Sequence, residues 1–301
     1  MVSRSPHAWL LNFAAEAELA DPSAHTLARA MEARSRALVE RARGLLGPDD
    51  VVIFPGVRAP GHAGRAWCPT PRALTAIARA GARVPAAPPI AVLRRVNHRR
   101  FCAELGQMLP GARYVTSRAE LDETLAARDP TWVLKRPFGF AGRGRLRVAG
   151  GSAAGADAAT RSWIEASLAA SEGLQVEPWV DRAGDFALHG HLSSKGGELA
   201  LGDPTSQRCD ETGAWVASAR AAEEALSDVE RAALTTATVE AAEALAAAGY
   251  FGPFGVDAFR WRDAGGTLHF NPRCEINARY SMGWAVGMGT RRPDLEDDGF
   301  G

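Results

Sequence analysis

Lysine is almost absent from this chain: of the 35 basic residues only Lys135 and Lys195 are lysines, and the rest are arginines. Acidic residues also number 35, so no excess charge favours nucleic acid or an anionic membrane as a partner. No apolar run approaches the roughly 18 residues that a membrane-spanning helix needs, and the first residues lack a signal-peptide pattern. These absences predict a protein with no nucleic-acid and no membrane partner.

Cysteine is also scarce, and its spacing is uninformative. The four cysteines form no CxxC pair and no zinc-like pattern (Cys68, Cys102, Cys209 and Cys274). Together with the absent signal pattern, this predicts a reducing, cytoplasmic location. With 301 residues, 46% of them hydrophobic and 23% charged, the chain can bury a large core and is predicted to form two domains.

The chain begins with a strand–helix–strand pattern. Residues 8–13 are predicted to form a strand, residues 25–46 an amphipathic helix, and residues 50–54 (DVVIF) a strand buried on both faces of a parallel sheet. This βαβ order predicts an α/β domain. A boundary is expected at about residue 90, where prolines punctuate an apolar segment, and Asn97 is predicted to cap a helix over residues 98–108.

The loop predicted over residues 55–71 has two interpretations. Loops carry a large share of functional residues, and this one offers substrate-binding candidates, namely Arg58, His62, Arg65 and Trp67. The alternative is an unconstrained connection. Arg208, in a second predicted polar loop over residues 207–215, is a further candidate for a substrate carboxylate, with a surface arginine as the alternative.

The most informative stretch runs over residues 252–283. Two apolar runs flank a Gly-Gly turn at residues 263–266, which is a hairpin signal because glycine reaches the φ > 0 conformations of tight turns. Asp257 on the first strand would then lie near Glu275 and Asn277, just after the second. Oxygen ligands of this kind suit Mg²⁺, and Arg279 adds a permanent positive charge. The alternative is an ordinary hairpin with solvated charges.

A second stretch, over residues 131–148, is predicted to form strand, glycine-rich turn and strand. Its glycines (Gly139, Gly142 and Gly144) would let backbone N–H groups approach phosphate oxygens, and Lys135 adds a point charge. The spacing matches neither a Walker A loop nor a Rossmann fingerprint. A flexible hairpin tip is the alternative. His189 and His191 share one strand face, where half-buried histidines are favoured over a metal pair.

These stretches together resemble the ATP-grasp superfamily of nucleotide-dependent ligases from about residue 97 to residue 283. Residues 135–144 resemble the lysine and glycine-rich loop that covers the phosphates, residues 176–180 the adenine-binding hinge, and Asp257 with residues 275–279 the metal-ligand strands and their ExNxR ending. The resemblance implies Mg²⁺ ligands Asp257, Glu275 and Asn277 (one or two ions, with Mn²⁺ as an alternative), and catalytic roles for Arg279 and Lys135. It implies nucleotide contacts from Arg99, Arg100, Lys135, Gly139, Gly142, Gly144, Glu177, Trp179, Val180 and Asp185.

Two positions depart from the family pattern. The first ATP lysine is replaced by Arg99 or Arg100, which keeps the charge but not its shape. D-alanine–D-alanine ligases have a hinge that residues 176–180 resemble well, but they usually carry an arginine where this chain has Gly255. The resemblance therefore does not extend to their substrate.

The resemblance implies an α/β fold, α+β in the catalytic part. The expected domains are a Rossmann-like domain (1–93), a two-lobed ATP-grasp domain (94–290, with a lid over about 115–175 and a C-terminal lobe over about 176–290) and a disordered tail (291–301). The expected enzyme is an ATP- and Mg²⁺-dependent ligase that activates a small-molecule carboxylate for attack by an amine or thiol. The alternatives are a phosphotransferase with a hydroxyl acceptor and a non-catalytic nucleotide-binding homologue. A homodimer is compatible with the sequence.

Overall fold

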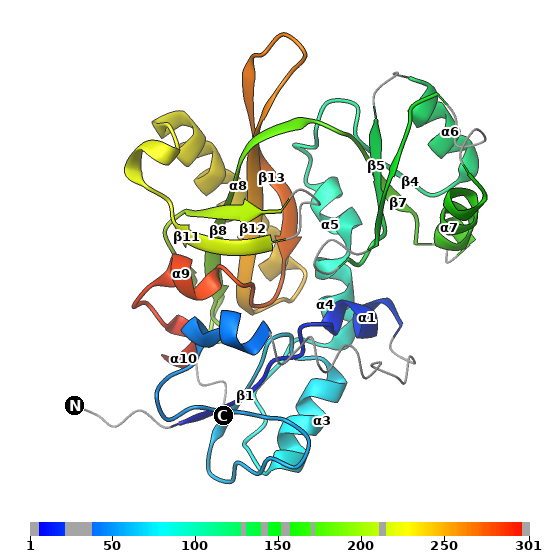
Figure 1. Cartoon of the computed structure of the whole chain (residues 1–301). Coiled ribbons are helices and arrows are strands. Elements are labelled where there is room, and N and C mark those ends of the chain that lie inside the picture. Colours follow the sequence, from blue (N-terminus) through cyan, green and yellow to red (C-terminus); the bar gives the residue numbers. More distant parts are fainter. Residues whose placement is uncertain are drawn as a thin grey trace.

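The computed structural model describes residues 6–21, 38–127, 131–139, 144–151, 157–169, 172–210 and 215–296. Their backbone forms three β-sheets with helices packed against them (Figure 1). The predicted mixture of helices and strands is therefore confirmed. Within these residues, no helix is both long and apolar enough to cross a membrane.

The N-terminal sheet is parallel, with strand order β2-β1-β3 (β1 His7–Leu10, β2 Val51–Val52, β3 Ala63–Ala66). Asp50 ties its start together, because its carboxylate accepts from the His7 N–H at 2.8 Å and the Trp9 Nε1–H at 2.9 Å. β1 pairs in parallel with both β2 and β3, so the carboxyl ends of β1 and β3 lie at the same end of the sheet. The chain continues there into helix α1 (Ala15–Ala20) after β1 and into Trp67 after β3.

Several N-terminal predictions differ from the structure. The predicted strand over residues 50–54 shortens to β2, and the predicted loop over residues 55–71 contains β3. That loop then enters α3 (Pro71–Ala80), where the Thr70 side chain accepts from the Ala73 N–H and Gly81 ends the helix at φ 82°. Most of the helix predicted over residues 25–46 lies outside the described residues; the part seen is helical at 38–41 and ends in a 3₁₀ turn, Arg43–Leu45.

The predicted helix over residues 98–108 is wrong in its bounds. Two helices occur instead, α4 (Ile90–Asn97) and α5 (Arg99–Glu104), so residue 90 starts a helix. The cap of α5 is His98, whose side chain accepts from the Arg100 N–H. Asn97 does not cap α5. Its side chain instead accepts from the Ala278 N–H at 3.0 Å and donates to the Ala278 carbonyl at 3.2 Å. This contact fixes α4 to the end of the last strand.

The second sheet is antiparallel, with order β4-β7-β5-β6, and is covered on its outer side by α6 and α7 (Figure 1). The predicted capping box at Ser117 and Glu120 is confirmed at the start of α6. The strands on either side of the glycine-rich turn, β5 and β6, pair as predicted, while residues 140–143, including Gly142, lie outside the described residues. The bounds are β4 Arg113–Val115, α6 Arg118–Ala126, β5 Trp132–Lys135, β6 Arg145–Val148, α7 Ala158–Ala169 and β7 Leu174–Pro178.

The third and largest sheet is also antiparallel, with order β11-β10-β8-β12-β13 and β9 beside β8. Helix α8 packs on it and carries the predicted capping box at Ser227 and Glu230. The hairpin predicted over residues 252–283 is β12 and β13, and its tip projects from the sheet (Figure 1). The bounds are β8 Asp181–Leu192, β9 Leu199–Leu201, β10 Thr205–Cys209, β11 Trp215–Arg220, α8 Asp228–Ala247, β12 Gly252–Arg262 and β13 Leu268–Asn277.

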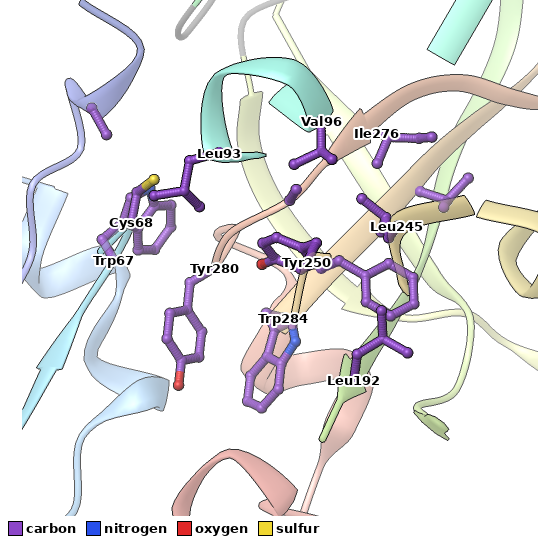
Figure 2. Packing of buried hydrophobic residues seen from close by; sticks show 14 of the residues in the cluster. Trp67, Cys68, Leu93, Val96, Leu192, Leu245, Tyr250, Ile276, Tyr280 and Trp284 are labelled. Carbon is purple, nitrogen blue, oxygen red and sulfur yellow. The ribbon is translucent and has the colours of Figure 1, made fainter. Parts of the chain in front are cut away.

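The main hydrophobic core joins the N-terminal part to the large sheet. Figure 2 shows Trp67 and Cys68 beside Leu93, with Tyr280 and Trp284 in the same cluster. The C-terminal segment closes this core with α9 (Trp284–Met288) and α10 (Pro293–Glu296). Residues 293–296 were expected to be part of a disordered tail, but Asp294 is buried and accepts from the Tyr280 hydroxyl at 2.7 Å. Residues 297–301 lie outside the described residues.

Candidate functional site

A cavity of about 590 Å³ lies between the second sheet, the large sheet and the N-terminal part. Most of the site residues predicted from the sequence line it: Arg99, Lys135, Gly139, Glu177, Trp179, Val180, Asp185, Asp257, Glu275, Asn277 and Arg279. Arg100 and Gly144 do not line it, and Gly142 is outside the described residues. Arg65 lines a separate cavity of about 70 Å³. The three distant stretches of the sequence therefore meet around one cavity.

The predicted oxygen ligands are brought together by the register of the hairpin. Asp257 on β12 lies directly opposite Glu275 on β13, and Gly255 lies opposite Asn277. Directly opposed residues project from the same face of a sheet, and the Asn277 Nδ2 donates to the Asp257 carboxylate at 2.9 Å. The sequence placed Glu275 and Asn277 just after the second strand, but they are its last residues. Extended backbone at these positions fixes the spacing of the three side chains.

Gln207 is a member of this group that the sequence did not reveal. Its segment was predicted to be a polar loop, but residues 205–209 form β10, and the Gln207 Nε2 donates to the other oxygen of Asp257 at 2.8 Å. Burial, and then the charge of Glu275, raise the pKa of Asp257 to about 6, although Gln207 and Asn277 act to lower it. Two carboxylates and an amide oxygen suit Mg²⁺, which completes its shell with water and phosphate oxygens. The residues present therefore fit a magnesium ion.

Three cationic side chains at the cavity are each paired with a carboxylate. The Lys135 Nζ lies 2.6 Å from Glu177, the Arg99 guanidinium 3.0 Å from Glu275, and the Arg279 guanidinium contacts Glu16. Burial acts to raise the pKa of Glu275, but the charges of Arg99 and Lys135 outweigh it and lower that pKa. An incoming anion must therefore compete with a carboxylate for each of these cations.

The structure separates the two arginines that the sequence left as alternatives. Arg99 is held in the cavity, where its Nε donates to the carbonyl of Arg136 at 3.2 Å in addition to its pairing with Glu275. Arg100 lies outside the cavity, 3.6 Å from Glu104 and over the ring of Tyr114. One step along a helix turns a side chain by about 100°, so only one of the two adjacent residues can face the cavity.

Glu16 is a second residue that the sequence did not reveal. It belongs to α1 in the N-terminal part, is only 6% exposed, and forms an ion pair with Arg279. Burial raises the pKa of Glu16, and the charge of Arg279 opposes that shift. Arg279 is itself 8% exposed and donates to the carbonyl of Tyr280 at 2.9 Å. The N-terminal part thus supplies the counter-charge for the arginine that follows the oxygen ligands.

The hinge segment lies at the other end of the cavity. Glu177 accepts from Lys135 and from the Gln175 amide, so its carboxylate is fully engaged. The Trp179 N–H donates to the carbonyl of Thr131 at 2.7 Å, and the Arg147 guanidinium lies 3.9 Å from the Trp179 ring centroid. Asp185 is paired with Arg182 at 2.5 Å. The segment is anchored to the second sheet and presents an exposed aromatic ring.

His189 and His191 do not form a metal site with the residues described. The sequence predicted half-buried histidines, but the two residues are only 1% and 5% exposed. Burial lowers the pKa of His189 to about 4. In the described part of the chain, no group of three His, Cys, Asp or Glu side chains is arranged to hold a metal. The His189 ring packs over Gly255, where an added Cβ would lie 2.9 Å from its Cδ2.

Solved structures show which fold this is. Biotin carboxylase from Campylobacter jejuni, described as a β-γ-ATP complex, superimposes with a TM-score of 0.60 at 13% identity, over 98% of this chain and 71% of that chain. D-alanyl-alanine synthetase A from Vibrio cholerae gives a TM-score of 0.53 at 11% identity, over 98% of this chain and 94% of that chain. N5-carboxyaminoimidazole synthase from Aspergillus clavatus, in complex with ADP and 5-aminoimidazole ribonucleotide, gives a TM-score of 0.52 at 15% identity, over 97% of this chain and 77% of that chain.

No family model and no curated protein matches the sequence. The superimposed structures are ATP-grasp ligases, so the resemblance inferred from three short stretches is confirmed at the level of fold. At these identities the superposition identifies no subfamily.

Proposed function

We propose that this protein is an ATP- and Mg²⁺-dependent ligase that activates a carboxylate as an acyl phosphate for attack by an amine or a thiol. The observation that carries the proposal is the single cavity that collects Lys135, Arg99, Arg279 and the Asp257, Glu275 and Asn277 group. Phosphoryl transfer requires charge neutralisation and alignment more than covalent help from the protein. The cavity supplies cationic side chains and oxygen ligands that can meet both requirements.

The positions of the side chains at the cavity support the following roles. Lys135 and Arg99 hold the nucleotide phosphates, and Arg279 stabilises the group in transfer. The hinge at Glu177, Trp179 and Val180 faces the adenine, Asp185 faces the ribose, and Gly139 lies beside the phosphates. A magnesium ion held by Asp257, Glu275 and Asn277 would neutralise phosphate charge.

The proposed chemistry has two bond exchanges. A substrate carboxylate oxygen attacks the γ-phosphorus, and the bond to ADP breaks. The amine nitrogen then attacks the carbonyl carbon, the bond to the phosphoryl oxygen breaks, phosphate leaves, and the proton lost by the amine goes to solvent. Excluding water protects the acyl phosphate from hydrolysis between these steps.

The solved structures support this proposal through their own ligands and names. One is described with β-γ-ATP and another with ADP and a ribonucleotide, and a third is named D-alanyl-alanine synthetase A. A Rossmann-like N-terminal domain ending near residue 93, a cytoplasmic location and a homodimer stay predictions of the sequence.

Two other functions fit the same fold. A phosphotransferase would pass the γ-phosphoryl group to a hydroxyl, and its product would retain phosphate instead of releasing it. A non-catalytic homologue would bind ATP without forming ADP. The non-catalytic homologue ranks below the two enzymes because each predicted metal ligand and Lys135 is present at the cavity.

The test is release of ADP and phosphate with panels of acids and amines, using an Asp257→Asn variant. Loss of the metal-binding carboxylate should abolish turnover. Asp263→Asn is the matched control, since Asp263 lies on the same hairpin but at its exposed turn. Full turnover by Asp257→Asn would refute the proposal.

A further inference from the structure

One end of the cavity is built from three segments that lie far apart in the sequence. Trp67 follows β3 at the carboxyl edge of the parallel sheet, Trp215 begins β11, and Ser281 with Met282 follows β13. All four residues line the cavity together with Arg279. Open α/β sheets commonly bind ligands at the carboxyl ends of their strands. This end therefore has the position of a substrate compartment.

Three hydrogen-bond donors at this end have no partner within the described part of the chain. They are the Trp67 Nε1–H, the Arg279 Nε–H and the Ser281 hydroxyl, and each polar atom is buried. Trp67 is 1% exposed and Arg279 8% exposed, and the Arg279 Cζ lies 5.9 Å from the centroid of the Trp67 ring. A buried donor without a partner destabilises the folded protein. Three such donors together indicate a missing acceptor.

The missing acceptor is best matched by a carboxylate. Lys135 and Arg99 are already assigned to the nucleotide phosphates by the proposed function. Each terminal nitrogen of Arg279 has a partner, Tyr280 or Glu16, whereas its Nε has no partner within the described residues. Two neutral donors and one guanidinium N–H suit a singly charged, planar anion. They do not supply the concentrated positive charge that a second polyphosphate requires.

The neighbouring surface is apolar. The Trp215 Nε1–H donates to the Ser218 hydroxyl at 2.8 Å, so the rest of that ring offers carbon surface. One side of the ring is near the Arg41 guanidinium, whose Cζ lies 5.9 Å from the ring centroid. Met282 and Leu38 add flexible apolar side chains to the same cavity. Aromatic and methionine surfaces favour a bulky apolar ligand over a small or highly charged one.

We propose, as a refinement that rests on the proposed function, that the acid substrate has a bulky apolar or aromatic body. Its carboxylate is bound by the donors of Trp67, Arg279 and Ser281, and its body packs against Trp215 and Met282.

The first experiment measures binding and does not depend on turnover. Calorimetry of the full chain saturated with ADP and Mg²⁺ compares 3-phenylpropionate with acetate and succinate. We expect 3-phenylpropionate to bind at least tenfold more tightly than either. Trp67→Phe, which keeps an aromatic ring but removes the N–H donor, should weaken that binding about tenfold without changing ADP affinity.

Trp132→Phe is the matched control. The Trp132 indole nitrogen is also buried and without a partner, but Trp132 packs in the core of the second sheet and does not line the cavity. Equal weakening by both variants, or tighter binding of acetate or succinate, would overturn the inference. Trp215→Ala should remove the preference for 3-phenylpropionate over acetate.

A second experiment separates this inference from the proposed function. The same acids are incubated with ATP, Mg²⁺ and hydroxylamine, whose nitrogen displaces phosphate from an acyl phosphate to give a hydroxamate. Hydroxamate from 3-phenylpropionate but not from acetate supports both proposals. Selective binding without hydroxamate from any acid supports the compartment and contradicts the ligase, while hydroxamate from succinate or acetate alone supports the ligase and contradicts the compartment.

Discussion

Replacing Glu275 by glutamine should strengthen the binding of metal-free ATP, although it removes a proposed magnesium ligand. In the structure Glu275 neutralises Arg99 at 3.0 Å, with the two side chains 31% and 12% exposed. Metal-free ATP must break this pair before Arg99 can reach a phosphate. In the unmodified protein, magnesium would engage Glu275 and release Arg99, so ATP and Mg²⁺ should bind with positive coupling.

The size of the effect follows from the geometry of the pair. Unit charges about 3 Å apart attract by about 5 kcal/mol at the effective dielectric of a partly buried site. Glutamine keeps the size and one acceptor, and desolvation offsets much of the Coulomb energy. We expect a net gain of about 1–2 kcal/mol, which is about 5- to 30-fold in affinity for ATP in EDTA. Turnover should be lost, and Mg²⁺ should no longer tighten ATP binding.

Calorimetry with ATP in EDTA measures the affinity for metal-free ATP, and calorimetry in excess Mg²⁺ measures how far the metal tightens ATP binding. Glu230→Gln is the matched control, because Glu230 pairs with Arg260 at 2.6 Å with similar exposure but outside the cavity. The reasoning is refuted if Glu275→Gln binds metal-free ATP no more tightly than the unmodified protein, or if Glu230→Gln shows the same gain.

Two further predictions concern buried carboxylates. Because the pKa of Asp257 is raised from 3.8 to about 6, the folded protein binds more protons than the unfolded chain between these pH values. Stability should therefore fall by about 2 kcal/mol as pH rises from 4 to 6, out of about 3 kcal/mol for the complete titration. In urea titrations, the stability of Asp257→Asn should depend less on pH over this range, and an unchanged pH dependence would contradict the shift. Glu16→Gln leaves the buried Arg279 without its counter-charge and should cost about 3–5 kcal/mol in urea unfolding. Glu104→Gln, which breaks the exposed pair with Arg100, should cost less than about 1 kcal/mol, and equal losses would argue against a structural role for the Glu16 pair.

The features that the sequence revealed are local ones. The hairpin that carries Asp257, Glu275 and Asn277 could be predicted because its turn and its two apolar runs are adjacent in the chain. The strand pair around Lys135 and the capping boxes at Ser117 and Ser227 could be predicted for the same reason. Their order along the chain was enough to indicate the fold.

The features that the sequence did not reveal depend on long-range contacts. Glu16 meets Arg279 only because the N-terminal sheet docks on the large sheet, and no local pattern encodes that contact. Gln207 on β10 reaches Asp257 on β12 across strand β8, and its segment was predicted to be a polar loop. The choice between Arg99 and Arg100 required the start of α5, which the sequence placed incorrectly because Asn97 has a tertiary partner.

The central claim is that a carboxylate oxygen attacks the γ-phosphorus of ATP. The most direct measurement uses the acid that supports turnover, labelled with ¹⁸O in both carboxylate oxygens, and analyses the released phosphate by mass spectrometry. An acyl phosphate intermediate transfers one ¹⁸O atom into each phosphate released to an amine or to hydroxylamine. Phosphate that carries no ¹⁸O, although ADP is formed, would contradict the account.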